Sequence, residues 1–265
     1  MLKRAFLLAL AGLVLAGCAT VPVTGRNQLL LVPQAELAAM GAESYHEFID
    51  ESRLSDDAVA TAMVRRVGHK VADSAEIFLA SHGLARDIEY YDWEFNLIDD
   101  DETVNAFCVS GGKIAVYTGI LPITKDEDGL AVVVAHEVAH ALANHGGERM
   151  SQLLIAELGG MALSKAVEKE PEKTQEIWKI AYGIGAQVGF LLPYSRQQES
   201  EADRIGLILM AQAGYDPRAA VPFWERRAAL GDEAPPEFLS THPSTETRIE
   251  DIRAHLPEAL EYYGR

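Results

Sequence analysis

The run HEVAH, residues 136–140, contains the side chains of this sequence most suited to chemistry. On a helix, residues four apart lie on one face, so His136 and His140 can bind one Zn²⁺ through their imidazoles. Glu137, one step round the helix, reaches a water molecule beside that metal and can act as a general base. The spacing therefore predicts a peptidase site with one zinc ion per chain as its cofactor and Glu137 as its catalytic residue.

The residues around this run predict the helix that the spacing requires. Thr124 and Glu127 form a capping box, apolar residues fill the stretches on both sides of the run, and Asn144 offers a stop. The two imidazoles and the carboxylate would then lie inside a buried helix. Because buried polar groups are costly without partners, a bound metal explains their presence there.

Two histidines leave the coordination of a zinc ion incomplete, so a third protein ligand must come from elsewhere in the chain. The metzincin pattern fails, because Ala143 and Gly146 stand where it requires Gly and His. His145 is one residue short of that place. We therefore expect His145 to be either a surface histidine or one that supports a ligand from behind.

A second predicted helix, residues 195–214, offers two carboxylates for the site. Glu199 and Asp203 are four apart and share one face, Glu201 points elsewhere, and Gly206 allows another helix to approach closely. The spacing allows Glu199 as third ligand, with Asp203 behind it orienting a ligand histidine. It equally allows a solvated acidic helix face.

Three motifs in order resemble metallopeptidase family 48, a gluzincin family: HEVAH, ESEAD at 199–203 and THPSTETR at 241–248. The resemblance implies a zincin-type fold, peptidase activity, Glu199 as the third zinc ligand and Asp203 behind the ligands. It covers nearly the whole chain after the N-terminus, because TGRNQLLLVP at 24–33 is similar to the start of bacterial lipoprotein members. The resemblance therefore implies a lipoprotein member of the family.

The third motif contains His242 and Arg248. A His-Pro pair in a loop rich in proline is most simply a turn. In some family members the matching histidine occupies the open zinc position at rest, so the resemblance implies that His242 holds the enzyme latent; alternatively, His242 stabilises the oxyanion. Arg248, at the matching place, would bind a substrate carboxyl or anchor the loop.

The segment VNAFCVSGGKIAVYTGIL, residues 104–121, resembles a family strand that pairs with extended substrate beside the metal. The resemblance places the exposed substrate edge strand at Gly112, Lys113, Ile114, Ala115, Val116 and Tyr117. A plain hairpin around the turn at Gly111 and Gly112 fits the pattern equally well. The family often has Ala-Leu-Pro where this chain has Cys108, Val109 and Ser110, which leaves the preferred substrate side chains open.

The N-terminus predicts a lipoprotein signal peptide, residues 1–17. A positively charged start precedes the apolar run 5–15, which is short for a membrane-spanning helix. The following LAGC resembles a lipobox, so Cys18 would be lipid-modified and residues 18–34 would form a tether or arm at the membrane. Because Ala19 and not Asp follows, the expected location is the outer membrane of a two-membrane bacterium, facing the periplasm.

Residues 35–265 are expected to form a single α+β domain, mostly helical with a small antiparallel sheet. Apolar spacing predicts helices at 35–49 and 58–79, and aromatic and β-branched residues predict antiparallel strands at 90–98 and 103–117. The formal net charge is −17 and no basic cluster occurs. This charge argues against nucleic acid as a partner and against direct docking on anionic lipid.

These features together predict a membrane-anchored zinc metalloendopeptidase that cleaves unfolded or misassembled cell-envelope proteins. The alternative is a periplasmic chaperone or assembly factor for outer-membrane proteins, with proteolysis secondary and the outer-membrane assembly machinery as a partner. The family resemblance allows both roles at once. A purely structural zinc site is disfavoured, because such a site needs no Glu137 and usually has four protein ligands.

Overall fold

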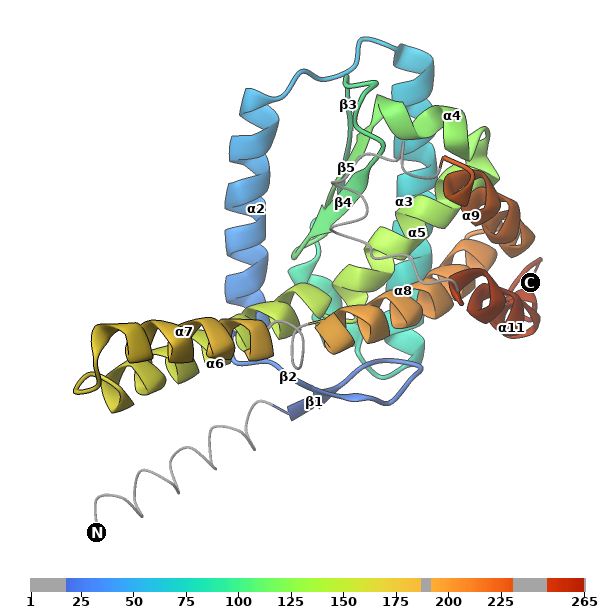
Figure 1. Cartoon of the computed structure of the whole chain (residues 1–265). Helices are drawn as coiled ribbons and strands as arrows, with labels where there is room; N and C mark the ends of the chain where they lie inside the picture. The colour runs from blue at the N-terminus through green and yellow to red at the C-terminus, as the bar shows by residue number, and fades with distance from the viewer. Residues whose placement is uncertain (1–17, 187–191, 231–246, 265) are drawn as a thin grey trace.

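The computed structural model describes residues 18–186, 192–230 and 247–264 (Figure 1). The predicted signal peptide, residues 1–17, and His242 lie outside the described residues. The α+β class is confirmed: helices make up most of the described chain, with a three-stranded sheet and a separate two-stranded hairpin. Among the described residues, no helix is both long and apolar enough to cross a membrane.

Helix α5 (Glu127–Leu142) carries HEVAH and is buried along almost its whole length in the middle of the fold (Figure 1). Its N-cap is Asp126, whose side chain accepts a hydrogen bond from the backbone N–H of Gly129. The predicted capping box was therefore wrong. Thr124 instead ends the short helix α4 (Leu121–Thr124) and lies buried there, so its side chain is not placed to cap α5.

Helices α3 (Ala58–Ser81) and α8 (Leu192–Gln212) pack against α5 and share its core. The contact between α8 and α5 is close at Gly206, where an added Cβ would lie 3.1 Å from the backbone nitrogen of His136. The predicted role of Gly206 in close helix approach is thereby confirmed. The glycine brings the backbone that carries Glu199 next to the backbone that carries the histidines.

The three-stranded sheet has the order β3-β5-β4, formed by β3 (Glu94–Ile98), β5 (Lys113–Tyr117) and β4 (Ala106–Val109). β4 and β5 are antiparallel, as predicted, but β3 and β5 are parallel. The chain crosses over after β3, so that β4 pairs with the far side of β5. The predicted substrate edge at residues 112–117 was also wrong, because β5 is the central strand and β4 is the edge.

Residues 18–34, predicted as a tether or arm, contain a hairpin of β1 (Cys18–Thr20) and β2 (Asn27–Leu29). The hairpin packs on the domain: Val21 in its turn is buried in the main core. After β2, the backbone N–H of Leu31 donates to the Ser151 hydroxyl. Helix α2 (Gln34–Glu51) follows and covers the sheet through Tyr45, whose hydroxyl donates to the Ile114 carbonyl in β5.

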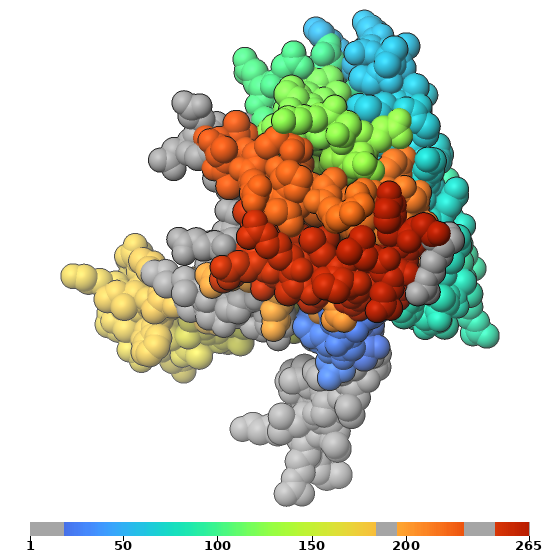
Figure 2. Space-filling model, turned by 90° about the vertical axis from the view of Figure 1, so that its right-hand side faces the viewer, coloured from blue at the N-terminus to red at the C-terminus, as the bar shows by residue number. Residues whose placement is uncertain are grey.

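Helices α6 (His145–Ala166) and α7 (Glu172–Ala186) form a hairpin that stands out from the body of the molecule (Figure 2, yellow). On α7, the side chains of Ile177 and Trp178 are more than half exposed. Helix α11 (Arg248–Leu260) packs against α8, and helix α9 (Ala220–Ala228) packs against α11, α4 and α5.

Candidate active site

His136, His140 and Glu199 gather their ligand atoms at one point between α5 and α8. The Nε2 atoms of His136 and His140 are 3.1 Å apart, and the Glu199 carboxylate oxygens lie 3.3 Å and 3.4 Å from them. Two ligands of a tetrahedral zinc ion, each bonded at about 2.0–2.1 Å, are about 3.3 Å apart. The three side chains therefore offer ligand atoms close enough to hold one zinc ion, with Oε2 of Glu199 nearer to His136 and Oε1 nearer to His140.

Glu137 lies between this group and the edge strand β4. Its side chain is almost fully buried, and its Oε2 accepts a hydrogen bond of 3.2 Å from the backbone N–H of Cys108. Glu137, Cys108, His140 and Glu199 line one shared pocket, in which the metal-binding group, a carboxylate and a strand edge meet. This arrangement brings a base and a peptide-binding edge to the same metal site.

Asp203 lies behind the ligands, as the sequence predicts, with its Oδ1 2.9 Å from Nδ1 of His136. Arg248, the first residue of α11, is buried and donates to Asp203 Oδ1 at 2.7 Å and to Glu199 at 3.3 Å. Its guanidinium stacks 3.5 Å above the Trp224 ring. Of the two roles predicted for Arg248, this burial fits an anchor for the segment and not a contact for a substrate carboxyl.

Burial and hydrogen bonding set the protonation of the ligands. Burial lowers the pKa of His140 to about 3, so this ring is neutral and its Nε2 is available to a metal. Burial also lowers the pKa of His136, but the hydrogen bonds with Asp203 and Glu199 outweigh it and raise the value to about 9. Metal binding at His136 therefore releases a proton near neutral pH.

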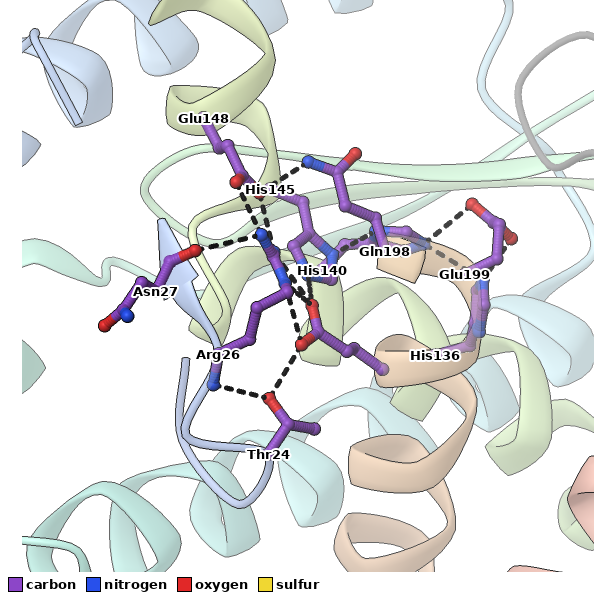
Figure 3. Close-up of polar contacts among 10 residues, drawn as sticks. Thr24, Arg26, Asn27, His136, His140, His145, Glu148, Gln198 and Glu199 are labelled. Atoms are coloured by element: carbon purple, nitrogen blue, oxygen red, sulfur yellow. Dashed lines mark hydrogen bonds and ion pairs between the residues drawn. The ribbon is translucent and has the colours of Figure 1, made fainter. Parts of the chain in front are cut away.

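A second polar cluster lies on the other side of His140 (Figure 3). His145 is buried, its Nδ1 is 2.8 Å from His140 Nδ1, and its Nε2 is 3.2 Å from Glu201 Oε2. The predicted alternative that placed His145 on the surface is therefore wrong. Glu201 faces away from the metal-binding group, as predicted, yet reaches it through His145.

Arg26 joins the same cluster from the N-terminal hairpin and pairs with Glu201 and Glu148. Burial raises the pKa of the Glu201 carboxyl, but the hydrogen bonds from His145 and Arg26 outweigh burial and lower it to about 2. Sequence reasoning missed this cluster. The TGRNQ motif was the available signal, since it places an arginine in a segment otherwise expected to be a tether.

Comparison with known proteins places this geometry in a family. The model of Peptidase family M48 matches residues 59–256. The mitochondrial metalloendopeptidase OMA1 of Schizosaccharomyces pombe is 41% identical over 169 residues, covering 63% of this chain and 48% of that protein. The OMA1 metalloendopeptidase of Danio rerio is 33% identical over 255 residues, covering 92% and 51%. The beta-barrel assembly-enhancing protease of Escherichia coli is 27% identical over 253 residues, covering 88% and 46%.

These relatives correct the predicted location. A lipid anchor in the bacterial outer membrane was expected, but six of the relatives are mitochondrial proteins from yeasts, a plant, a fish and mammals. The sorting argument from Ala19 therefore does not hold. Lipid modification of Cys18 stays a prediction. The chain spans about half the length of the three relatives just described.

Proposed function

Because the chain belongs to peptidase family M48, we propose that it is a zinc-dependent endopeptidase that cleaves polypeptide segments in extended conformation. The observation that carries the proposal is the grouping of His136, His140 and Glu199, whose nearest ligand atoms lie 3.1 Å, 3.3 Å and 3.4 Å apart, close to the separation of two ligands around a tetrahedral zinc ion. Three protein ligands leave one position for water or substrate, as in catalytic zinc sites.

Zinc, when bound, lowers the pKa of a water molecule and polarises the scissile carbonyl. Glu137 takes a proton from the attacking water and later passes it to the leaving amine. The hydrogen bond from the Cys108 backbone orients Glu137 for this work. Asp203 accepts from Nδ1 of His136, so that Nε2 of that ring faces the metal position.

We assign substrate binding to the outer edge of β4, which pairs with no other strand among the described residues, in place of residues 112–117. The backbone carbonyls of Asn105 and Val109 face β5, because they accept hydrogen bonds from the N–H groups of Tyr117 and Gly112. Backbone groups of successive strand residues point to opposite sides, so the N–H of Cys108 faces away from β5 and donates to Glu137. An extended peptide that pairs with this edge would lie beside Glu137 and the metal-binding group. Unfolded or misassembled proteins supply such segments.

The test compares wild type with Glu137→Gln on one unfolded protein, such as reduced casein, and on one folded protein. We expect wild type to cleave the unfolded substrate alone and to lose activity with a chelator. Glu137→Gln should keep one zinc per chain and lose activity by about 10²–10⁴-fold, because only the base is removed. Cleavage by Glu137→Gln at the wild-type rate would contradict the proposal.

A second candidate role, assistance of protein assembly with proteolysis secondary, draws support from the relative called a beta-barrel assembly-enhancing protease. The same variant separates the two roles. Suppression of aggregation of an unfolded substrate by Glu137→Gln, at the level of wild type, favours an assembly role on this fold. Loss of that effect together with cleavage leaves proteolysis as the function.

A further inference from the structure

The buried cluster behind His140 joins three parts of the chain that are far apart in sequence (Figure 3). Arg26 comes from the N-terminal hairpin, His145 from the first turn of α6 and Glu201 from α8. The chain between α5 and α6 turns at Asn144, whose φ of 54° is left-handed. This turn lets His145 fold back onto the last turn of α5, where His140 lies.

Arg26 holds both carboxylates of the cluster at once. Its Nε lies 3.0 Å from each Glu201 oxygen, and its Nη1 and Nη2 donate to Glu148 at 2.6 Å and 2.7 Å. Thr24 adds a hydrogen bond of 2.7 Å to Glu201. Such charge-assisted contacts require Glu201 to be an anion that only accepts hydrogen bonds.

The proton positions then follow from one another along the chain of contacts. Because Glu201 accepts, His145 carries its proton on Nε2, and its Nδ1 is left as an acceptor. His140 must therefore carry its proton on Nδ1 to donate across the 2.8 Å contact between the rings. The lone pair of His140 then lies on Nε2, the atom that faces His136 and Glu199.

We propose that Glu201 and His145 form a relay that fixes the ring orientation and tautomer of His140 for metal binding. Arg26 anchors this relay, so the docked N-terminal hairpin contributes to the strength of the metal site. The proposal rests on the proposed function only in taking zinc as the metal. Metal-bound histidines commonly donate their other N–H to a carboxylate, and here one additional imidazole stands between them.

The relay differs from the direct support of the other histidine ligand. Asp203 contacts His136 without an intermediate, whereas Glu201 is separated from His140 by the His145 ring. Asp203 therefore supports His136, and Glu201 supports His140 through His145. Both carboxylates belong to helix α8. This assigns a function to Glu201 and to the arginine of the TGRNQ motif, neither of which contacts the metal-binding group directly.

The experiment measures zinc affinity by competition with a chelator, and thermal unfolding of the metal-free protein, for wild type and variants. We expect His145→Phe and Glu201→Ala to bind zinc about 10 to 100-fold more weakly. Arg26→Ala should weaken zinc binding by a smaller factor, and Arg26→Lys should restore part of it. The absorption spectrum of the cobalt-substituted protein should change in His145→Phe, since the His140 ring is no longer oriented.

Glu258→Gln is the matched control. Glu258 lies on α11 and pairs with Arg204 of α8, the helix that also carries Glu201, but it does not contact His145 or His140. Its zinc affinity should stay within about twofold of wild type. If the cluster only clamps the hairpin, the variants lose thermal stability while zinc affinity and the cobalt spectrum stay unchanged, which would overturn the relay. Should His145→Phe or Glu201→Ala fail to fold, Glu201→Gln carries the same test, because it keeps the shape and removes the charge.

These readouts do not depend on peptidase activity. Wild type that binds zinc tightly but cleaves no unfolded substrate would contradict the proposed function and leave the relay standing. Wild-type zinc affinity in folded His145→Phe and Glu201→Gln would contradict the relay and leave the peptidase function standing. The two proposals therefore fail by different measurements.

Discussion

Asp203 Oδ1 lies 2.9 Å from Nδ1 of His136, on the opposite side of the imidazole from the nitrogen that faces Glu199. Burial raises the pKa of Asp203, but Arg248 and the hydrogen bond with His136 outweigh burial and lower it, so the carboxylate is charged. A charged acceptor at Nδ1 keeps the proton there and leaves Nε2 for the metal. The orientation of His136 therefore depends on a residue of α8 that does not itself face the metal position.

We expect Asp203→Asn to weaken zinc binding about 10 to 100-fold, because the amide removes the charge that orients His136. Competition with a chelator measures the change. Asp73→Asn is the control, since Asp73 is exposed on α3 and should leave zinc affinity unchanged. Equal zinc affinity of Asp203→Asn and wild type would show that the ring is held by other contacts.

Glu199→Ala should lose stoichiometric zinc, whereas Glu137→Gln should retain it. Glu199 supplies one of the three grouped ligand atoms, and Glu137 contacts the Cys108 backbone beside that group. Metal analysis of both purified variants at equal protein concentration measures the difference. Stoichiometric zinc in Glu199→Ala would require another third ligand and would remove the match with a His₂Glu site.

The sequence predicted those parts of the site that follow helical periodicity. His136, His140, Glu199 and Asp203 each lie on a helix face that a spacing of four defines, and the structure brings these four side chains together. Helices α3 and α5 were expected for the same reason, since their apolar faces repeat along the sequence. Within these elements, local pattern and tertiary packing favour the same conformation.

The remaining features depend on contacts that have no periodic signal. The approach of His145 to His140 requires the left-handed turn at Asn144, and the pairing of Arg26 with Glu201 joins residues 175 positions apart. The parallel pairing of β3 with β5 depends on which side of β5 the chain reaches after β3. The family resemblance placed the substrate edge on what is the central strand, and the alternating pattern of a strand could not correct this, because it defines the faces of a strand but not its neighbours.

Gly206→Ala should destabilise the fold by about 1–3 kcal/mol, because an added methyl group overpacks the contact between α8 and α5. Its Cβ would lie 3.1 Å from His136 N and 3.2 Å from the Ala135 carbonyl oxygen. Zinc binding should weaken as well, since this contact sets the separation of Glu199 from His136. Denaturant unfolding of the metal-free protein and chelator competition measure the two effects.

Gly183→Ala provides the control for that substitution. Gly183 lies in helix α7, and no described atom lies within 4 Å of the Cβ position. Alanine is the better helix former there, so the variant should be more stable by about 0.5–1 kcal/mol. Similar unfolding free energies for the two variants would mean that α8 and α5 can separate without cost.

Cys108 should react slowly with thiol reagents although it lies beside the proposed active site. Burial, and after it the negative charge of Glu137, raise the pKa of the Cys108 thiol well above its usual range. The attacking species is the thiolate, whose fraction falls tenfold for each unit by which the pKa exceeds the pH. At pH 8 we therefore expect iodoacetamide to modify the peptide that contains Cys108 at least about tenfold more slowly than free cysteine. The rate should still be rising above pH 9, because a raised pKa keeps the thiol neutral over that range.

Glu137→Gln should accelerate this reaction, because the substitution removes the charge that opposes the thiolate. The acceleration should be partial, since burial is the larger cause of the raised pKa and remains in the variant. Mass spectrometry of the peptide over a pH series measures both rates. A rate in wild type that equals that of free cysteine, or a plateau below pH 9, would mean that burial does not raise the pKa of the thiol. Equal rates in wild type and Glu137→Gln would mean that Glu137 does not act on the thiol. The carboxylate would then lie farther from the β4 edge than its hydrogen bond to Cys108 indicates.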